Sequence, residues 1–560
     1  MRNIIKNIIL GALILLLAAS CDKEKFFELE RIPESPWTDL NTIERAAVAP
    51  YNYLAAPIEK GQPSWNAALG VTIFMDMASS DLGAVAPTVP VANAPWDVYA
   101  YRTYHEISIT PGSKGGGRQY NIFKLSYQML TACNDPLDFI AKSGNGEIFP
   151  GVTTDHETIK RIKAELLFNR ARAYSYLVRN FCPPYNPGGD NSKKLLPYKV
   201  SYTGDPQQLR NTQLASAEEI YTLIISDLTT AKSLMPVTYN QEGRANYYAI
   251  CGELARIYFL IGKYSEARAE CDEILNSGKF PLQSDIMTTW TKAPGEAPAS
   301  EVIMEFVPDL VTNNFEADKS IVSKCTPYGG KNGGRGTDWI HTPWAMFYMS
   351  NYFMKETGWM VDPANGDYTV GALALQDKRY NNTYLRLEGY IPLPAGMDKV
   401  TYRNTIMSQN KGITWPSIWL DKYYRGAQGN NTKDPLYRSA EFYLTRAAID
   451  CVTDFGDMGE ADLNIVRNRA GLSSIFKAEF PNKDDWFNEI HRERIREIGN
   501  ENGDRIRYLM SLRLPLGLGD RPVDGSKGAI IYPPYEKFYF RIPEDEVNGN
   551  AAYPQGFNQD

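Results

Sequence analysis

Five spaced positions in the segment CGELARIYFLIGKYSEARAECDEIL constrain the fold of this chain more than any other feature. A small residue is followed three positions later by an aromatic residue, then by a glycine, a second aromatic residue and an alanine, at Ala255, Tyr258, Gly262, Tyr264 and Ala267. Small residues let two antiparallel helices approach closely, and the tyrosines fill the space beside them. The glycine marks the turn, so the segment is predicted to be a helical hairpin.

This spacing is that of a tetratricopeptide repeat, for which a scaffold role and a concave peptide-binding groove are both possible. Helical periodicity extends from Thr38 to about residue 280. One long helical segment, DHETIKRIKAELLFNRARAYSYLVRNF, runs into Pro183 and Pro184, which cannot continue a helix. We therefore predict a series of packed helical hairpins in this half of the chain.

The composition changes between residues 283 and 437, where Gly, Pro, Asn and aromatic residues replace the helical pattern, as in CTPYGGKNGGRGTDWIHTPWAMF. A long irregular stretch inside a compact protein is uncommon unless it is functional or disordered. Its tryptophans argue against disorder. Binding residues concentrate on loops held by a rigid scaffold, so this loop-rich lobe is the predicted place for a ligand.

Helices return in YRSAEFYLTRAAIDCV, EADLNIVRNRAGL and WFNEIHRERIREIGNENGDRIRYLMSLR. Glu493 and Glu497 in the last segment could form a catalytic carboxylate pair. They are interleaved with arginines at helical spacing, however, and such residues more often form ion pairs that tie helices together. We predict that these two glutamates are structural.

The amino-terminal segment has the form of a lipoprotein signal. Arg2 and Lys6 precede an apolar run that ends at LAAS, immediately before Cys21. The run is about a dozen residues, whereas a membrane-spanning helix needs about 20. We predict a signal peptide over residues 1–20, a diacylglycerol on the Cys21 thiol and a lipidated tether over 21–37. An ordinary export signal that happens to precede a cysteine is the alternative.

Composition and motifs argue against several functions. The 59 basic and 66 acidic residues leave a net charge of −7, which does not suit nucleic acid. The chain contains no HExxH, GxSxG or Walker-type motif, so no catalytic residue and no cofactor is predicted. DPANGDYT is at most a faint calcium-type loop, and no metal site is predicted. Five cysteines lie in helical or helix-ending segments and are predicted to be isolated buried thiols, with an oxidised pair as the alternative in an exported protein: Cys133, Cys182, Cys251, Cys271 and Cys451.

Several segments occur in an order that is typical of one family. They are the lipobox at Cys21, IERAAVAPYNYL, MDMASSDLG, AELLFNRARAYSYLVRNFCPPY, the repeat at 245–275, AEFYLTRAAIDCV with NIVRNRAGL, RERIREIGNENGDRIRYL, and the closing FRIPEDEVNGNAAYPQGFNQD. Together they resemble the SusD/RagB family, the surface glycan-binding lipoproteins that pair with TonB-dependent outer-membrane transporters. The stretch ENGDR departs from the family pattern by one extra residue, which concerns the local helix geometry.

The resemblance implies a mainly α-helical fold, with about four tetratricopeptide-like helix pairs packed against an irregular, loop-rich lobe. It divides the chain into a SusD-like helical region at 38–282 and a SusD/RagB-type region at 283–560, which includes the lobe at 283–437 and the C-terminal helices. The protein would capture an oligosaccharide without catalysis and deliver it to a SusC-like TonB-dependent transporter. It would be lipid-anchored in the outer membrane, on the cell surface.

Aromatic side chains on irregular segments are the best candidates for glycan contacts, because flat rings suit the apolar faces of sugars. The family often places contacts in an early excursion, which here favours Trp96 and Tyr99. In the lobe the candidates are Tyr328, Trp339 and Trp344, with Arg335, Asp338 and His341 as possible hydroxyl partners and Trp290, Trp359 and Trp415 as reserves. An aromatic residue that merely packs a loop down is the alternative at each position.

Two other functions remain open at this point. The RagB branch of the family suggests that the same scaffold can take a peptide or another nutrient. A glycoside hydrolase would need two carboxyl groups about 5 to 10 Å apart in a cleft, a distance that spacing along the chain cannot give.

Overall fold

The computed structural model describes most of the helical scaffold and parts of the lobe. The described residues are 37–53, 82–84, 117–144, 146–307, 347–349, 351–361, 369–386, 396, 418–420, 422, 433–501, 504–517, 530–535 and 538–557. Within these ranges the protein is mainly α-helical, as predicted.

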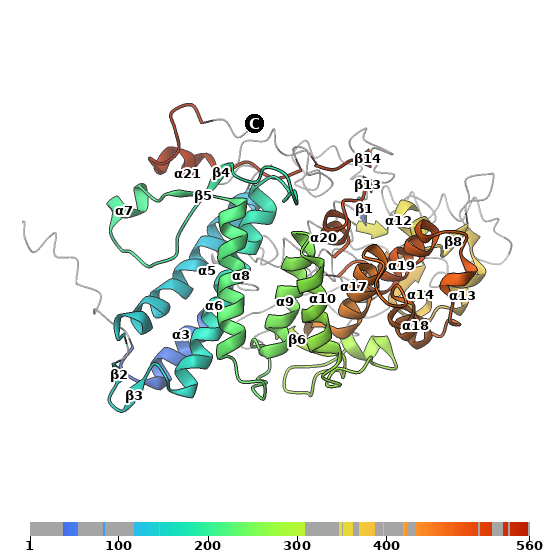
Figure 1. Ribbon diagram of the computed structural model, residues 1–560, viewed down its shortest axis with the longest axis horizontal. Coiled ribbons are helices and arrows are strands. Elements are labelled where there is room, and N and C mark those ends of the chain that lie inside the picture. Colours follow the sequence, from blue (N-terminus) through green and yellow to red (C-terminus); the bar gives the residue numbers. More distant parts are fainter. Residues whose placement is uncertain are drawn as a thin grey trace, which may run out of the picture.

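Four helices form the first part of the scaffold: α3 (Leu40–Asn52), α5 (Gly117–Lys142), α6 (Glu157–Phe181) and α8 (Ala217–Leu234). Helix α6 packs between α5 and α8, and α3 lies against both α5 and α6 (Figure 1). Most side chains of α6 are buried, which explains why its sequence does not show a clear polar face.

The row of helices continues through α9 (Tyr247–Leu260), α10 (Tyr264–Leu275) and α17 (Ser439–Val452), each packed against the next. Helices α9 and α10 are the predicted hairpin. Ala255 and Ala267 are fully buried at their contact, and Gly262 adopts a φ of 80° in the turn. A side chain at this glycine would meet Pro187 at 3.0 Å, so both backbone conformation and space favour glycine.

The C-terminal helices are α18 (Glu460–Arg469), α19 (Lys483–Ile498) and α20 (Asp504–Ser511). Helix α17 packs against α18 and α19, and α20 contacts both α9 and α19. The ENGDR stretch, where the sequence departs from the family pattern, interrupts the helix. Helix α19 ends before Gly499, and Asn500 has a left-handed φ of 66°, so the chain turns before α20 begins.

Polar side chains fix where the main helices begin. Ser216 and Glu219 form a capping box at the start of α8, with each side chain accepting a hydrogen bond from the other residue's backbone N–H. Asn246 caps α9 by accepting from the N–H of Ala249 at 2.8 Å. These residues set the boundaries of the helices that form the predicted hairpins.

Short antiparallel strand pairs connect the helices. Four of them are β2 (Glu147–Phe149) with β3 (Val152–Thr153), β4 (Lys194–Pro197) with β5 (Leu214–Ser216), β8 (Met360–Val361) with β9 (Thr369–Val370), and β13 (Leu516–Gly517) with β14 (Ile530–Ile531). The shorter helical elements are α7 (Pro206–Arg210), η3 (Ile286–Trp290), α12 (Asn351–Glu356), α13 (Ala372–Gln376), α14 (Lys378–Thr383), η7 (Lys477–Glu479) and α21 (Glu544–Gly549). The described part of residues 283–437 is therefore less irregular than the sequence indicated.

The core extends along the whole helical row. Trp290 and Trp359 are almost fully buried, and the indole N–H of Trp359 donates to Asp377 at 3.1 Å. The prediction that they are reserve ligand contacts was wrong, because side chains without exposed surface pack the interior.

The five cysteines predicted as isolated thiols are free and buried, as expected. In the part of the chain that the structure describes, no helix has the length and apolarity to cross a bilayer.

Candidate functional site

The lobe starts and ends at one pair of strands. Strand β6 (Val302–Phe306) pairs antiparallel with β12 (Asp434–Arg438), and Phe306 lies opposite Asp434. The segment between them leaves the scaffold at the end of β6 and returns at the start of β12. Its two ends are therefore neighbours, although they are far apart in the sequence.

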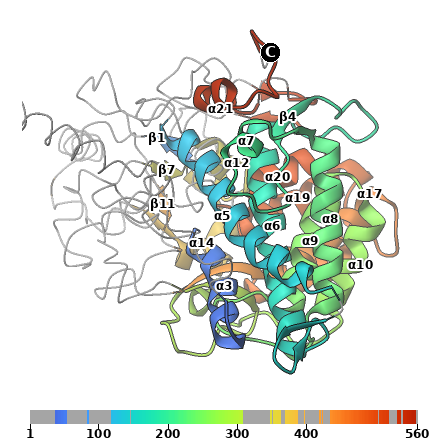
Figure 2. The ribbon, with the colours of Figure 1, turned by 90° about the vertical axis from the view of Figure 1, so that its left-hand side faces the viewer.

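A second strand pair joins the early excursion to the lobe. Strand β1 (Leu82–Ala84) pairs with β7 (Phe347–Met349), so a segment near the N-terminal helices meets a segment of the lobe. Strand β10 (Tyr384–Arg386) pairs with β11 (Ile418–Leu420), and β11 also lies against β7. Figure 2 shows β1, β7 and β11 together on one side of the helical body.

Apart from the buried Trp290 and Trp359, the predicted binding residues and the predicted lipidation site lie outside the described residues. These are Cys21, Trp96, Tyr99, Tyr328, Arg335, Asp338, Trp339, His341 and Trp344, together with the reserve Trp415. The β1–β7 strand pair nevertheless shows where two of the predicted segments start. Trp96 and Tyr99 follow β1 along the chain, and Trp344 precedes β7 by three residues, so the two predicted segments leave the same strand pair.

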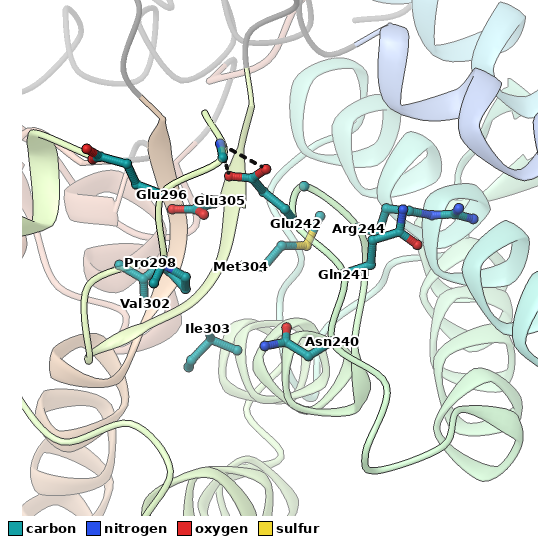
Figure 3. Close-up of a pocket in the computed structure, with 13 residues that line it drawn as sticks. Asn240, Gln241, Glu242, Arg244, Glu296, Pro298, Val302, Ile303, Met304 and Glu305 are labelled. Atoms are coloured by element: carbon teal, nitrogen blue, oxygen red, sulfur yellow. Dashed lines mark hydrogen bonds between the residues drawn. The ribbon is translucent and has the colours of Figure 1, made fainter. Parts of the chain in front are cut away.

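A pocket of about 240 Å³ lies at the root of the lobe, between residues 240–244 and 295–305 (Figure 3). Asn240, Glu242 and Glu305 give it polar walls, and Ile303 is part of an apolar wall. Arg244 points away from the pocket toward the helices, where it pairs with Glu44 and Glu165. None of the described residues that line the pocket is aromatic, so it offers no ring for stacking on a sugar.

Lys433 lies directly before β12 and forms ion pairs with two glutamates that line this pocket. Its buried ammonium pairs with Glu242 at 2.8 Å and Glu305 at 2.5 Å, and donates to the backbone carbonyl of Glu296 at 2.6 Å. Burial raises the pKa of Glu305, although Lys433 offsets part of that rise. Burial disfavours the charged lysine, but the bonds to Glu242 and Glu305 outweigh it and raise the pKa of Lys433.

The glutamates of the pocket are already engaged in the fold. Glu242 also accepts from the backbone N–H of Gly295 at 3.0 Å, and Glu296 accepts from that of Ala293 at 2.9 Å. They therefore serve as anchors rather than as a free acid and base. The sequence contains no motif around Lys433 that predicts this role, because its partners come from two distant segments.

Glu493 and Glu497 are structural, as predicted. Glu497 is fully buried and receives hydrogen bonds from Arg438 at 2.6 Å, Arg379 at 3.2 Å and Arg469. Burial alone would raise the pKa of Glu497, but these three arginines hold it well below its usual range. Glu493 pairs with Arg379 at 2.6 Å and with Arg496 at 2.9 Å. The two carboxylates thus bind α14 and β12 to α19.

Lys422 anchors the other end of the strand framework. It follows β11 closely in the chain, pairs with Glu501 at 2.5 Å and donates to the backbone carbonyls of Glu497 and Gly499 at 3.2 and 3.1 Å. These carbonyls belong to the C-terminal end of α19, where a cation is favourable. Strand β11, next to the strand pair that joins the two predicted binding segments, is thereby fixed to the C-terminal helices.

The described residues contain no group of three His, Cys, Asp or Glu side chains placed to hold a metal ion. What the described geometry provides is a rigid helical row, two closed strand pairs and buried ionic anchors. These features hold the two ends of the lobe and the strands β1, β7 and β11 against the helices.

Family models identify which scaffold this is. A SusD-like model with the description "Starch-binding associating with outer membrane" matches residues 88–259, and the SusD/RagB model of the SusD family matches residues 310–510. The chain belongs to the SusD family, so the resemblance seen in its sequence is confirmed. No curated protein sequence matches this chain.

Solved structures share the fold over nearly the whole chain. A SusD superfamily protein from Bacteroides thetaiotaomicron is 18% identical, with a TM-score of 0.64 over 92% of this chain and 100% of that one. A SusD-like carbohydrate binding protein from Bacteroides vulgatus is 15% identical, with a TM-score of 0.62 over 94% and 99%. Surface glycan-binding protein A from B. thetaiotaomicron, solved with laminarihexaose, is 18% identical, with a TM-score of 0.60 over 92% and 99%.

Proposed function

We propose that this protein captures an oligosaccharide and delivers it to a SusC-like TonB-dependent transporter, without catalysing a reaction. Membership of the SusD family supports this role, since one family model describes starch binding in association with the outer membrane. A protein of the same fold, surface glycan-binding protein A, holds laminarihexaose. The engaged carboxylates of the described pocket agree with binding rather than hydrolysis.

The observation that carries the proposal is the pairing of β1 with β7. The early excursion and the lobe each contain aromatic candidates, and this pairing joins the two segments at their base. A sugar site assembled from both segments would combine Trp96 and Tyr99 with Trp339 and Trp344. Aromatic rings from two chain segments can contact successive sugar units, while polar neighbours bind the hydroxyl groups.

The aromatic candidates can be tested by substitution. Trp339→Ala and Trp344→Ala should each weaken glycan binding about tenfold or more, because each removes a large apolar contact surface. Affinity is measured by calorimetry with laminarihexaose and with the strongest ligand from a glycan array. Phe476→Ala is the control, since Phe476 is an exposed aromatic residue next to the C-terminal helices, 50% accessible. Melting temperatures should change little in all three variants.

Three outcomes would contradict the proposal in different ways. Unchanged affinity in both tryptophan variants would remove this part of the lobe from the site. Absence of glycan binding, with a peptide retained on purification, would favour the peptide-binding alternative. Release of reducing ends from a polysaccharide, abolished by one Asp or Glu substitution, would show an enzyme.

The proposed anchor is the lipidated Cys21. Cys21→Ser should remove the acylated thiol and move the protein from the membrane fraction to the soluble fraction, while its fold and ligand binding stay intact. Cell fractionation and protease accessibility on intact cells measure the location.

Affinity purification of the wild-type protein should recover a TonB-dependent transporter. Absence of a transporter from the purified material would contradict the proposed partnership.

A further inference from the structure

A narrow cavity lies where the C-terminal ends of α6 and α9 meet α20. Its volume is about 20 Å³, and it is partly open to solvent. The described residues that line it include three arginines and no carboxylate: Val178, Arg179, Pro184, Tyr185, Tyr221, Leu260, Ile506, Arg507, Met510 and Arg513. The charged side chains of this described lining are therefore all cationic.

Arg507 is the most buried of the three arginines, with 8% of its surface accessible. It lies 3.5 Å from a carboxylate oxygen of Asp504 and 3.5 Å from one of Glu441. Both carboxylates are held more tightly by other arginines. Arg494 binds Asp504 through two bonds of 2.8 and 2.6 Å, and Arg256 binds Glu441 through two of 2.7 and 2.5 Å.

Among the residues that the structure describes, the wider surroundings of Arg507 add one carboxylate and one arginine to this group. The carboxylate is that of Glu253, which lies 3.8 Å from Arg256 and also acts on Arg172. The described group therefore has four guanidinium groups, of Arg172, Arg256, Arg494 and Arg507, for three carboxylates. Burial, reinforced by the positive charge of Arg256, lowers the pKa of Arg507 to about 10, which is the response expected of an undercompensated guanidinium.

Arg513 is a second arginine that lines the cavity. Its backbone has a φ of 57°, a conformation that glycine adopts at much lower cost. Its guanidinium donates to the carbonyls of Met510 and Tyr185, and its buried Nε has no hydrogen-bond partner. An arginine kept in a strained conformation, with an unused donor beside a cationic cavity, indicates a role for its side chain.

We propose that this cavity binds a single halide ion, chloride in ordinary media, between Arg507 and Arg513. Its volume is close to that of one water-sized species, which excludes phosphate, sulfate and sugars. A monovalent anion there neutralises the surplus charge and accepts the free Arg513 donor. Arg507 lies on α20 and Arg513 just beyond it, and Arg513 also donates to the carbonyl of Tyr185, just beyond the end of α6.

Crystallography with bromide tests the site directly. Crystals of the full mature protein soaked in sodium bromide should show anomalous scattering inside the cavity, between the guanidinium groups of Arg507 and Arg513. Bromide replaces chloride with little change in size and scatters anomalously. A cavity without an anomalous peak at a bromide concentration that labels other surface sites would overturn the proposal.

Thermal unfolding tests it in solution. The midpoint should rise with chloride concentration when ionic strength is held constant with sodium gluconate, whose anion is too large for the cavity. Arg513→Gly keeps the left-handed backbone and removes the guanidinium, so it should weaken chloride binding roughly tenfold. Arg507→Met is the second variant. Arg210→Gln, at an exposed position on α7, removes one charge elsewhere and should respond as the wild type does.

The comparison between variants decides the result. General salt effects act alike on all four proteins, so the chloride response must be lost in both cavity variants and kept in Arg210→Gln. Equal responses in the wild type and Arg513→Gly would overturn the proposal even if all four proteins melt at different temperatures.

Discussion

Arginine and glutamate side chains take interior positions that apolar residues fill in most proteins. Glu493, Glu497 and Arg379 have almost no accessible surface, and each is paired. Desolvating a charge is costly, and leaving one member of such a pair alone costs about 3 to 5 kcal/mol. These residues therefore specify where α14 and α19 meet, since few other arrangements of the same elements would satisfy their charges.

The histidine on α19, His491, lies among arginines of the C-terminal helices. His491 stacks on Tyr508 with ring centroids 5.3 Å apart. Burial, with the positive charges of Arg505 and Arg494, lowers the pKa of His491 from 6.5 to about 3. The folded protein thus keeps this ring neutral, whereas the unfolded chain binds a proton below pH 6.5. His491 therefore costs stability as the pH falls through that window.

Replacing this histidine should reduce acid sensitivity. His491→Phe keeps the stacked ring and removes the proton uptake of the unfolded state. Between pH 6.5 and about 3, the free energy of unfolding should fall less steeply in the variant, by up to about 1.4 kcal/mol per pH unit. Urea unfolding at several pH values measures the slope, and near-UV circular dichroism checks native packing. Parallel slopes in the two proteins would contradict the assignment.

At the scale of elements, helices were far easier to predict than strands. The α9–α10 hairpin could be predicted because the spacing of five residues is that of a tetratricopeptide repeat. The local sequence is therefore enough to predict this element. Strands β1 and β7 have three residues each, which is too short for a period-two pattern to be recognised. Their pairing also joins residues that are distant in the chain. The break between α19 and α20 depends on Asn500 in a left-handed conformation, which asparagine adopts only in some contexts.

The strand pair at the base of the lobe depends on Lys433. Lys433→Met should lower the free energy of unfolding by about 3 to 5 kcal/mol, because it leaves the buried Glu305 and its neighbour Glu242 without their cation. Urea unfolding at neutral pH measures the change. The control is Lys483→Met, whose pair with Asp454 is exposed on both sides and should contribute less than about 1 kcal/mol.

A pH series separates the electrostatic cause from lost packing in the Lys433→Met variant. Without Lys433 the pKa of Glu305 should rise further, so the variant should recover part of its stability as the pH is lowered and Glu305 takes up a proton. A stability loss that does not change with pH would indicate that the lysine stem, rather than its charge, is what the fold requires.

At the scale of the whole molecule, sequence and structure agree on the helical scaffold and divide over the site. Helical periodicity, the repeat spacing and the ordered family segments predicted the row of helices and the SusD family. The aromatic candidates Trp339 and Trp344 stay predictions, whereas Trp290 and Trp359 belong to the core. A tryptophan in a Gly- and Pro-rich stretch has the same local sequence signature in either role. Only the packing of distant segments separates a ligand contact from a buried anchor.

The pairing of Phe306 with Asp434 affects how the sequence of the lobe can change during evolution. The two ends of this inserted segment are fixed as neighbours. The free-energy cost of closing the loop between them therefore depends only weakly on its length and rises by about 0.6 kcal/mol for each doubling. Recombination can exchange the insert while the helices that carry it keep their sequence and contacts. Under the proposed function, exchange of this one segment would change the ligand while the helical framework is kept.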